Sequence, residues 1–397
     1  MARIASAVAA SALLVVSVGQ PEASASSTGR DGAEASIVAG QPGSIASFPW
    51  LAYVAYRGPV DKFSCGGTVI APRLVLTAAH CALTSTGKVA TASNFAVLTG
   101  VTDLREASAE RASAVSQVLI FPEYDPTRVL NDAALLVLAS PVAAPALPIA
   151  TASDAGLFAD GTPVAIAGWG LTRVRPPNLP AVLRQAQSVV RSTSSCRRAL
   201  GRVLLTFDPA GQICVRSSAS LCNGDSGGPA VATRPDGTAV LVGIASLKAS
   251  ATCSPGVPQV MARVDRVSSW ASAWIAAIES GGPAPPVVVP AVKLPPVTRG
   301  DAELVAWLGL EADFGVRFVG GRGHEIACRR LARERVKCRL QWLRRNHLYR
   351  GAITVYTALP REGSIYNYRY TIRRFSFGCW LANRNPLGAC NPRVFRR

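Results

Sequence analysis

The sequence predicts an all-β main domain that ends in one helix and is followed by a small β or α+β domain. Up to residue 280, short runs rich in Val, Ile, Leu and Thr alternate with turn residues, as in SCGGTVIAPRLVLTAAHC and GTPVAIAGWG. This pattern is typical of a β-barrel or β-sandwich. Apolar residues then recur at three- and four-residue spacing across residues 264–278, which predicts a closing helix. The stretch SGGPAPPVVVPAVKLPPVT ends at residue 298 and predicts an extended linker over residues 281–298, because its prolines prevent helix formation.

The first 25 residues have the pattern of a secretory signal peptide. Arg3 precedes an apolar run from Ala5 to Val18, and Ala23-Ser24-Ala25 is a small-residue cleavage site. The alternative, a membrane anchor, is disfavoured because the run is too short to span a bilayer. We therefore expect residues 1–25 to be removed and the mature chain to be extracellular, with no integral membrane span.

The chain has ten cysteines, an even number that fits an oxidising compartment. Six lie in the main domain and four in the second domain. CxxC pairs and zinc-ligand spacings are missing from the sequence, so we expect no metal site and no cofactor. In the second domain we expect Cys328 to pair with Cys338 across a hairpin and Cys379 with Cys390 around a short loop, although the sequence allows three connectivities.

The second domain, residues 299–397, mixes a short helical pattern with alternating strands. AELVAWLGL predicts the helix, and RVKCRLQWLRR, GAITVYTAL and SIYNYRYTIRRFSF predict strands, the last two joined by the turn PREGS. Tyr366, Tyr368 and Tyr370 share one face of the last strand, which predicts that this face is packed.

The positive charge is concentrated in this second domain. The whole chain has a net charge of +18, and residues 299–397 contain 20 Lys and Arg against 7 Asp and Glu. Such an Arg-rich surface is able to bind phosphates or other anions. For an exported protein, an anionic cell-wall polymer or polysaccharide is favoured over nucleic acid as the partner. The alternative, hydrated arginines with no partner, is equally consistent with the pattern.

CNGDSGGPA holds a candidate nucleophile, Ser226. A serine hydroxyl needs an adjacent base, and its oxyanion intermediate needs backbone N–H donors. The amides of Gly224 and Ser226 would point at one spot if the glycine-rich segment forms a tight turn.

His80, in LTAAHC, is the only histidine of the main domain and so the candidate base. Asp132, in NDAALLVL, places a carboxylate at the start of an apolar strand, where a charge needs a partner. Taken alone, each residue has a structural alternative. His80 would be a buried structural histidine, and Asp132 would be a turn residue at the end of a strand.

The chain resembles the chymotrypsin–trypsin family of serine peptidases, of the secreted bacterial type, in seven segments of residues 37–280: IVAG, SCGGTVI, LTAAHC, NDAALL, AGWG, GDSGGP and PGV. The resemblance implies two six-stranded antiparallel β-barrels and a secreted endopeptidase that hydrolyses protein or peptide substrates. Ser226 would attack the scissile carbonyl, His80 would transfer the proton, and Asp132 would orient His80. Gly224 and Ser226 would form the oxyanion hole.

The resemblance also implies three disulfides in the main domain, which are Cys65–Cys81, Cys196–Cys214 and Cys222–Cys253.

A precursor that is cut before Ile37 is a further implication of the resemblance. The new amine of Ile37 would pair with Asp225, so that residues 26–36 form a propeptide. Ser36 precedes the cut where many relatives have Arg or Lys, and Arg30 is the nearest basic residue. Activation by an enzyme that tolerates small residues, trimming from Arg30 and self-cleavage all remain open.

Five residues are expected around the primary substrate pocket. Ser220 stands where trypsin has Asp, which removes the basis for binding Arg or Lys. Gly256 would leave the pocket open at depth, and Leu221 would narrow it. Ser246 and Lys248 lie on the substrate-pairing strand, and Lys248 either extends into solvent or attracts an acidic group. We expect apolar or aromatic residues before the cleaved bond, then acidic, then basic.

Two alternatives belong to other functional classes. One is a catalytically silent relative that serves as a binding protein, and the other is a surface adhesin that acts through the basic domain. An intact set of His80, Asp132, Ser226 and Gly224 argues for the enzyme.

Overall fold

A computed structural model describes the following residues of the chain: 37–59, 61–173, 177–201, 207–250, 253–289, 294, 296–357, 366–376 and 393–397. The expected signal peptide and propeptide, the turn PREGS, Cys379 and Cys390 lie outside these residues. Within the described part, no helix has the length and apolar character needed to cross a membrane.

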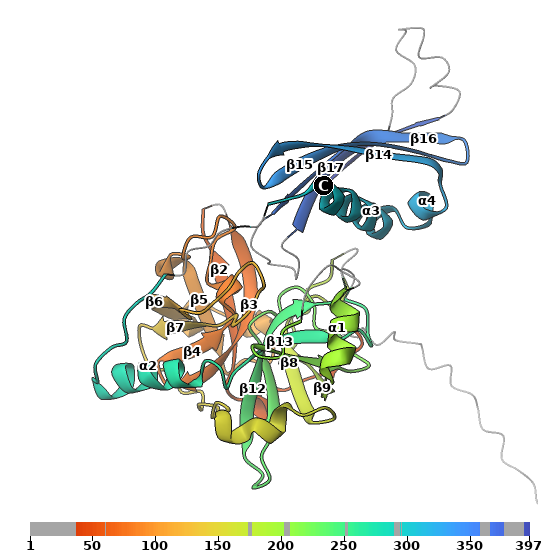
Figure 1. Ribbon diagram of the computed structural model, residues 1–397. Helices are drawn as coiled ribbons and strands as arrows, with labels where there is room; N and C mark the ends of the chain where they lie inside the picture. The colour runs from red at the N-terminus through yellow and green to blue at the C-terminus, as the bar shows by residue number, and fades with distance from the viewer. Residues whose placement is uncertain are drawn as a thin grey trace, which may run out of the picture. The chain divides into compact units, whose positions relative to one another are not determined.

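Six antiparallel strands form a first closed barrel, in the order β2-β3-β4-β7-β6-β5 (Figure 1). Their bounds are β2 Leu51–Arg57, β3 Lys62–Ala71, β4 Leu74–Thr77, β5 Phe95–Thr99, β6 Ser113–Ile120 and β7 Ala134–Leu138. All residues of β4 and β7 are buried, in agreement with the continuous apolar runs LVLT and ALLVL. Such runs are typical of strands that are covered on both faces.

A second barrel closes in the order β8-β9-β10-β13-β12-β11, with β11 pairing back onto β8. Its strands are β8 Pro163–Gly168, β9 Arg184–Arg191, β10 Gln212–Arg216, β11 Pro229–Thr233, β12 Ala239–Lys248 and β13 Gln259–Arg263. A two-residue strand, β1 Gln41–Pro42, adds to the edge of β9. The prediction of two six-stranded antiparallel barrels is confirmed.

The predicted closing helix is α2, Ser268–Ser280, and a shorter helix, α1 Thr193–Gly201, precedes β10. Trp270 of α2 packs edge-on against Phe121 at 5.3 Å between ring centroids, which anchors the helix to the first barrel. The helix ends where Gly281 takes the left-handed conformation (φ 65°). From Gly281 to Val289 the chain forms neither helix nor strand.

The C-terminal region is an α+β unit with a five-stranded antiparallel sheet in the order β14-β15-β16-β17-β18. The strands are β14 Arg322–Ala332, β15 Arg335–Arg344, β16 His347–Thr357, β17 Tyr366–Ser376 and β18 Arg393–Arg396. Two helices, α3 Arg299–Phe314 and α4 Val316–Val319, lie against one face of the sheet (Figure 1). The helix α3 begins before the predicted AELVAWLGL because Thr298 and Asp301 form reciprocal side chain to backbone hydrogen bonds at its start, and it continues to Phe314.

The core of this unit lies between α3 and the sheet. Trp342 is fully buried, stacks on Tyr349 at 4.6 Å between centroids, and donates its indole N–H to the Arg317 carbonyl at 2.8 Å. The predicted packing of Tyr366, Tyr368 and Tyr370 is confirmed, since all three contact this core. Cys328 and Cys338 face each other on β14 and β15 and form the expected disulfide.

Candidate active site

His80 and Asp132 are brought together by the pairing of β4 with β7. Thr77, at the end of β4, is in register with Ala134 of β7, so the residues that follow one strand and precede the other are neighbours. The ring Nδ1 of His80 lies 2.7 Å from Asp132 Oδ2, and the backbone N–H of His80 donates to Asp132 Oδ1 at 3.0 Å. Both side chains are buried, with exposed fractions of 2% and 0%. The carboxylate therefore fixes the position of the imidazole.

Ser246, on β12 of the second barrel, donates a third hydrogen bond to Asp132, at 2.6 Å from its Oγ to Oδ2. Burial acts to raise the pKa of Asp132, but its interactions with His80 and Ser246 outweigh burial, so the pKa is lowered. Asp132 is consequently held as a carboxylate at neutral pH. Ser246 was expected at the substrate pocket, and its contact with Asp132 had no signal in the sequence.

Ser226 lies in the turn between Asn223 and β11, and backbone contacts hold this turn against the first barrel. The N–H of Gly66 on β3 donates to the Ser226 carbonyl at 2.7 Å, and the carbonyl of Gly66 accepts from the Thr77 hydroxyl at 2.7 Å. Thr77 precedes His80 by three residues, so Gly66 is hydrogen-bonded both to the turn that carries Ser226 and to the segment that carries His80. The Nε2 atom of His80 is buried and has no hydrogen-bond partner within the described part of the chain.

Glycine is required in this turn for steric reasons. Gly224 and Gly227 have φ angles of 100° and 81°, in the left-handed region. A Cβ at Gly227 would lie 2.1 Å from the Thr77 hydroxyl, and one at Gly224 would lie 3.1 Å from the Gly170 Cα. The turn therefore packs so closely that only glycine fits at position 227.

Asp225 is buried behind the turn with an exposed fraction of 1%. Its carboxylate accepts hydrogen bonds from the backbone N–H groups of Gly170, at 2.7 Å, and Cys222, at 2.8 Å. A Cβ at Gly168 or Gly170 would lie 2.2 or 2.3 Å from that carboxyl group, which explains both glycines of the AGWG segment. Burial raises the pKa of Asp225 to about 6, although the two amide hydrogen bonds act in the opposite direction.

Ile37, the first described residue, is fully buried in the core of the second barrel. Its neighbour Val38 forms a β-bridge with Ser220, whose N–H donates to the Val38 carbonyl at 3.0 Å. The start of the described chain is thus attached to the segment that leads to Asp225 and Ser226.

Ser220 is fully buried, and its hydroxyl accepts a hydrogen bond from the side-chain Nε2 of Gln259 at 2.8 Å. Gln259 begins β13 and is in register with Lys248 of β12. Gln259 therefore lies against Ser220. Gly256 lies in the preceding loop with φ 75° and donates its N–H to the Ser217 carbonyl. Leu221, expected to narrow a pocket, packs into the core of the second barrel.

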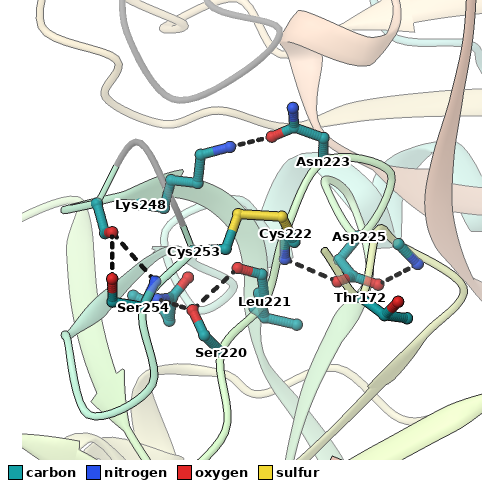
Figure 2. The surroundings of a disulfide bond; sticks show 12 residues. Thr172, Ser220, Leu221, Cys222, Asn223, Asp225, Lys248, Cys253 and Ser254 are labelled. Atoms are coloured by element: carbon teal, nitrogen blue, oxygen red, sulfur yellow. Dashed lines mark hydrogen bonds between the residues drawn. A yellow bond between two sulfur atoms is a disulfide. The ribbon is translucent and has the colours of Figure 1, made fainter. Parts of the chain in front are cut away.

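Lys248 extends across to the segment before the turn, where its ammonium donates to the Asn223 side-chain oxygen. Figure 2 shows this contact above the Cys222–Cys253 disulfide, with Ser220 on the other side of the disulfide. Lys248 is only partly exposed.

All three disulfides implied by the resemblance are present: Cys65–Cys81, Cys196–Cys214 and Cys222–Cys253. The first joins β3 to the short helical turn that carries His80. Cys65 and Cys81 also lie near His80 in the one cluster of metal-ligand types among the described residues. The two sulfurs are joined in a disulfide, and the His80 Nδ1 atom is hydrogen-bonded to Asp132. This cluster therefore does not offer a metal site.

Comparison with known proteins agrees with this architecture. A sequence model of the trypsin family matches residues 37–271. Human serine protease 56 is 32% identical over 256 residues, which cover 62% of this chain and 40% of that protein. Drosophila melanogaster serine protease filzig is 32% identical over 237 residues, 56% of this chain and 13% of that protein.

A trypsin from Saccharopolyspora erythraea is 32% identical over 231 residues, which cover 57% of this chain and 93% of that protein. The chain therefore spans well under half of the human and fly relatives and nearly the whole of the bacterial one. The family match includes both barrels and ends inside α2, before the proline-rich segment. This chain belongs to the trypsin family.

Proposed function

We propose that the protein is a serine endopeptidase that hydrolyses peptide bonds through Ser226, His80 and Asp132. The observation that carries this proposal is the buried His80 ring, bonded to Asp132 through Nδ1 with Nε2 left without a partner among the described residues. An imidazole oriented in this way is suited to accept the proton of a serine hydroxyl. The names of the bacterial and animal relatives support the same activity.

In the proposed reaction, Ser226 Oγ attacks the scissile carbonyl carbon while His80 Nε2 takes its proton. The carbonyl oxygen becomes an oxyanion that the amides of Gly224 and Ser226 stabilise. Collapse breaks the C–N bond, His80 returns the proton to the leaving amine, and an acyl-Ser226 ester remains. Water then attacks this ester with His80 as base and releases the acid. Asp132, held by Ser246, stabilises the imidazolium in both steps.

The precursor would be activated by cleavage before Ile37. Asp225 is buried, and burial raises its pKa to about 6, although two backbone N–H groups and the charge of Lys248 act in the opposite direction. A new ammonium at Ile37 would supply a cationic partner. Two observations support this proposal: the family match begins at residue 37, and Val38 forms a β-bridge with Ser220, in the segment that leads to the turn. Residues 1–25 and 26–36 act in this proposal as signal peptide and propeptide of a secreted zymogen.

The residue before the cleaved bond would be apolar or aromatic rather than basic. In the family, the segment around Ser220 forms the base of the primary pocket, and here Ser220 and Gln259 satisfy each other's hydrogen bonds. The nearest carboxylate, Asp225, already accepts two backbone N–H groups. A basic side chain would therefore be desolvated there without a counter-charge.

We also propose that residues 299–397, which follow the linker of residues 281–298, act as an accessory domain. It would hold the enzyme on an anionic cell-wall polymer or polysaccharide. The support for this is the net positive charge of the region.

The proposal is tested with the chain beginning at Ile37, incubated with a mixed peptide library that is read by mass spectrometry. Wild type should cut after aromatic residues or leucine, and Ser226→Ala should not cut. Cutting after arginine would contradict the pocket assignment, and cutting after glutamate would implicate Lys248. If neither protein cuts, the silent binding-protein alternative replaces the peptidase.

A further inference from the structure

One face of the C-terminal sheet is covered by α3 and the other, here called the outer face, carries a grid of arginines. Along β15, Val336, Cys338 and Leu340 are buried toward α3, whereas Arg335 and Arg339 are exposed. The same alternation continues on β16, where Ile353 and Val355 are buried. Because successive side chains of a strand point to opposite faces, the exposed set lies on the outer face.

The strand register aligns these residues into rows across the sheet. Arg329, Lys337, Thr354 and Arg369 form one row; Ala327, Arg339, Ala352, Thr371 and Arg396 form the next; Glu325, Gln341, Arg350 and Arg373 form the third. Arg335 lies beyond the first row, opposite Tyr356. Past the third row lie the apolar residues Leu343, Leu348 and Phe375, with Arg322 opposite Leu343.

The charge on this face is almost entirely of one sign. Among the described residues of the three rows and Arg335, the cations are Arg329, Arg335, Lys337, Arg339, Arg350, Arg369, Arg373 and Arg396. The single acid is Glu325, which accepts a hydrogen bond from Gln341 at 2.8 Å. The face therefore attracts anions over its whole width.

Two pairs of like charges stand directly opposite each other, Arg329 with Lys337 and Arg350 with Arg373. Like charges that stand directly opposite each other destabilise an antiparallel sheet. The row between them contains the small residues Ala327, Ala352 and Thr371 together with Arg339 and Arg396. An anionic ligand that lies across the rows would contact both members of each cationic pair and so offset the repulsion between them.

We propose that the outer face is a binding site for an acidic polysaccharide that bears carboxylate or sulfate groups. Seven of the eight cations are arginines, whose planar forks bind such groups through two parallel hydrogen bonds. The inference rests on the proposed accessory role of residues 299–397 and identifies the surface and the ligand for that role.

Nucleic acid fits this face less well. Binding of single strands relies on exposed aromatic rings that stack on bases. The described residues of the three rows include no aromatic side chain; Tyr356 lies beyond the first row, opposite Arg335, and Arg369 lies over its ring at 5.4 Å. Five strands at a spacing of about 4.8 Å span about 19 Å, which exceeds the major-groove width of about 12 Å.

The test compares two variants that lose the same charge at different places. Arg339→Gln, Arg350→Gln and Arg373→Gln are combined on the outer face. The matched control combines Arg317→Gln, Arg333→Gln and Arg345→Gln, three exposed arginines outside the three rows. All chains begin at Ser26 and carry Ser226→Ala, so the binding result does not depend on whether the protein hydrolyses peptides. Equal unfolding midpoints check that all chains are folded.

Binding to heparin and to alginate is measured between about 0.05 and 0.2 M salt, with a duplex DNA of about 30 base pairs alongside. The outer-face variant should bind the polysaccharides at least about tenfold more weakly, with a smaller salt dependence, whereas the control should change by less than about twofold. Equal losses in both variants would overturn the proposal in favour of overall charge. Tighter binding of wild type to the duplex, or no binding to either polysaccharide, would also overturn it.

Discussion

The side-chain amide of Gln259 donates to the Ser220 hydroxyl at 2.8 Å, and both residues are buried. This contact joins the segment that leads to Ser226 with the first residue of β13. Gln259 is paired with Lys248 of β12, beyond a bulge between Ala245 and Leu247. A long polar side chain, which the sequence did not point to, therefore contacts Ser220.

Gln259→Ala should enlarge the primary pocket and increase the preference for aromatic residues. We expect the ratio of kcat/KM for phenylalanine over leucine peptides to rise about tenfold, which corresponds to about 1.4 kcal/mol. Gln212→Ala is the matched control, because Gln212 is also buried but bonds to the Val129 carbonyl. An unchanged ratio in Gln259→Ala would show that this side chain does not limit the pocket.

Ser246→Ala should lower kcat/KM by about ten- to hundredfold, because it removes a hydrogen bond to the buried Asp132 carboxylate. Steady-state kinetics on a chromogenic peptide measures the loss. Ser188→Ala is a suitable control, since the Ser188 hydroxyl is buried without a hydrogen-bond partner in the described structure. Full activity of Ser246→Ala would mean that Asp132 needs no support from the second barrel.

Gly170→Ala should destabilise the protein, because its Cβ would lie 2.3 Å from the Asp225 carboxyl group. We expect a loss of about 3 kcal/mol in the free energy of unfolding, measured with urea, as for severe overpacking. Gly156→Ala is the control, because its Cβ would have no atom within 4 Å. It should change the unfolding free energy by less than about 0.5 kcal/mol. Equal effects of the two variants would contradict the close packing of Asp225.

The stability of the uncleaved precursor should fall as the pH rises from about 4 to about 6. Burial raises the pKa of Asp225 to about 6 in the folded chain, against about 3.9 when unfolded. The folded state therefore holds a proton that the unfolded state has lost, and this stabilisation is complete below pH 4 and lost above pH 6. The decrease is about 3 kcal/mol.

The measurement uses urea unfolding of the Ser226→Ala precursor across this pH range. Adding Asp225→Asn should remove the decrease, and a chain that begins at Ile37 should show a smaller one, because the new ammonium compensates the carboxylate. Parallel pH profiles for all three chains would contradict the pairing of Ile37 with Asp225.

The segments that hold the candidate triad were recognisable from the sequence because each is short and contiguous. The residues that support them were not, because their contacts depend on strand register. Ser246 reaches Asp132 from 114 positions away, across two barrels. Gln259 contacts Ser220, 39 positions away, and the sequence holds no signal for this pairing.

In the C-terminal region, the alternation of β15, β16 and β17 predicted these strands well. The neighbouring β14, RGHEIACRRLA, has few apolar residues and was expected only as the other half of the Cys328–Cys338 hairpin. The rows of arginines on the outer face could not be predicted, because they depend on the register of all five strands, which sequence alternation alone does not supply.

The most direct test of the central claim is active-site labelling with a fluorophosphonate, followed by mass spectrometry of the modified peptide. We expect the chain that begins at Ile37 to carry one adduct on Ser226, with labelling abolished by Ser226→Ala and strongly slowed by His80→Ala. The uncleaved precursor should label far more slowly. If the folded chain beginning at Ile37 acquires no adduct, or labels equally fast after His80→Ala, Ser226 is not an activated nucleophile and the account of this site is wrong.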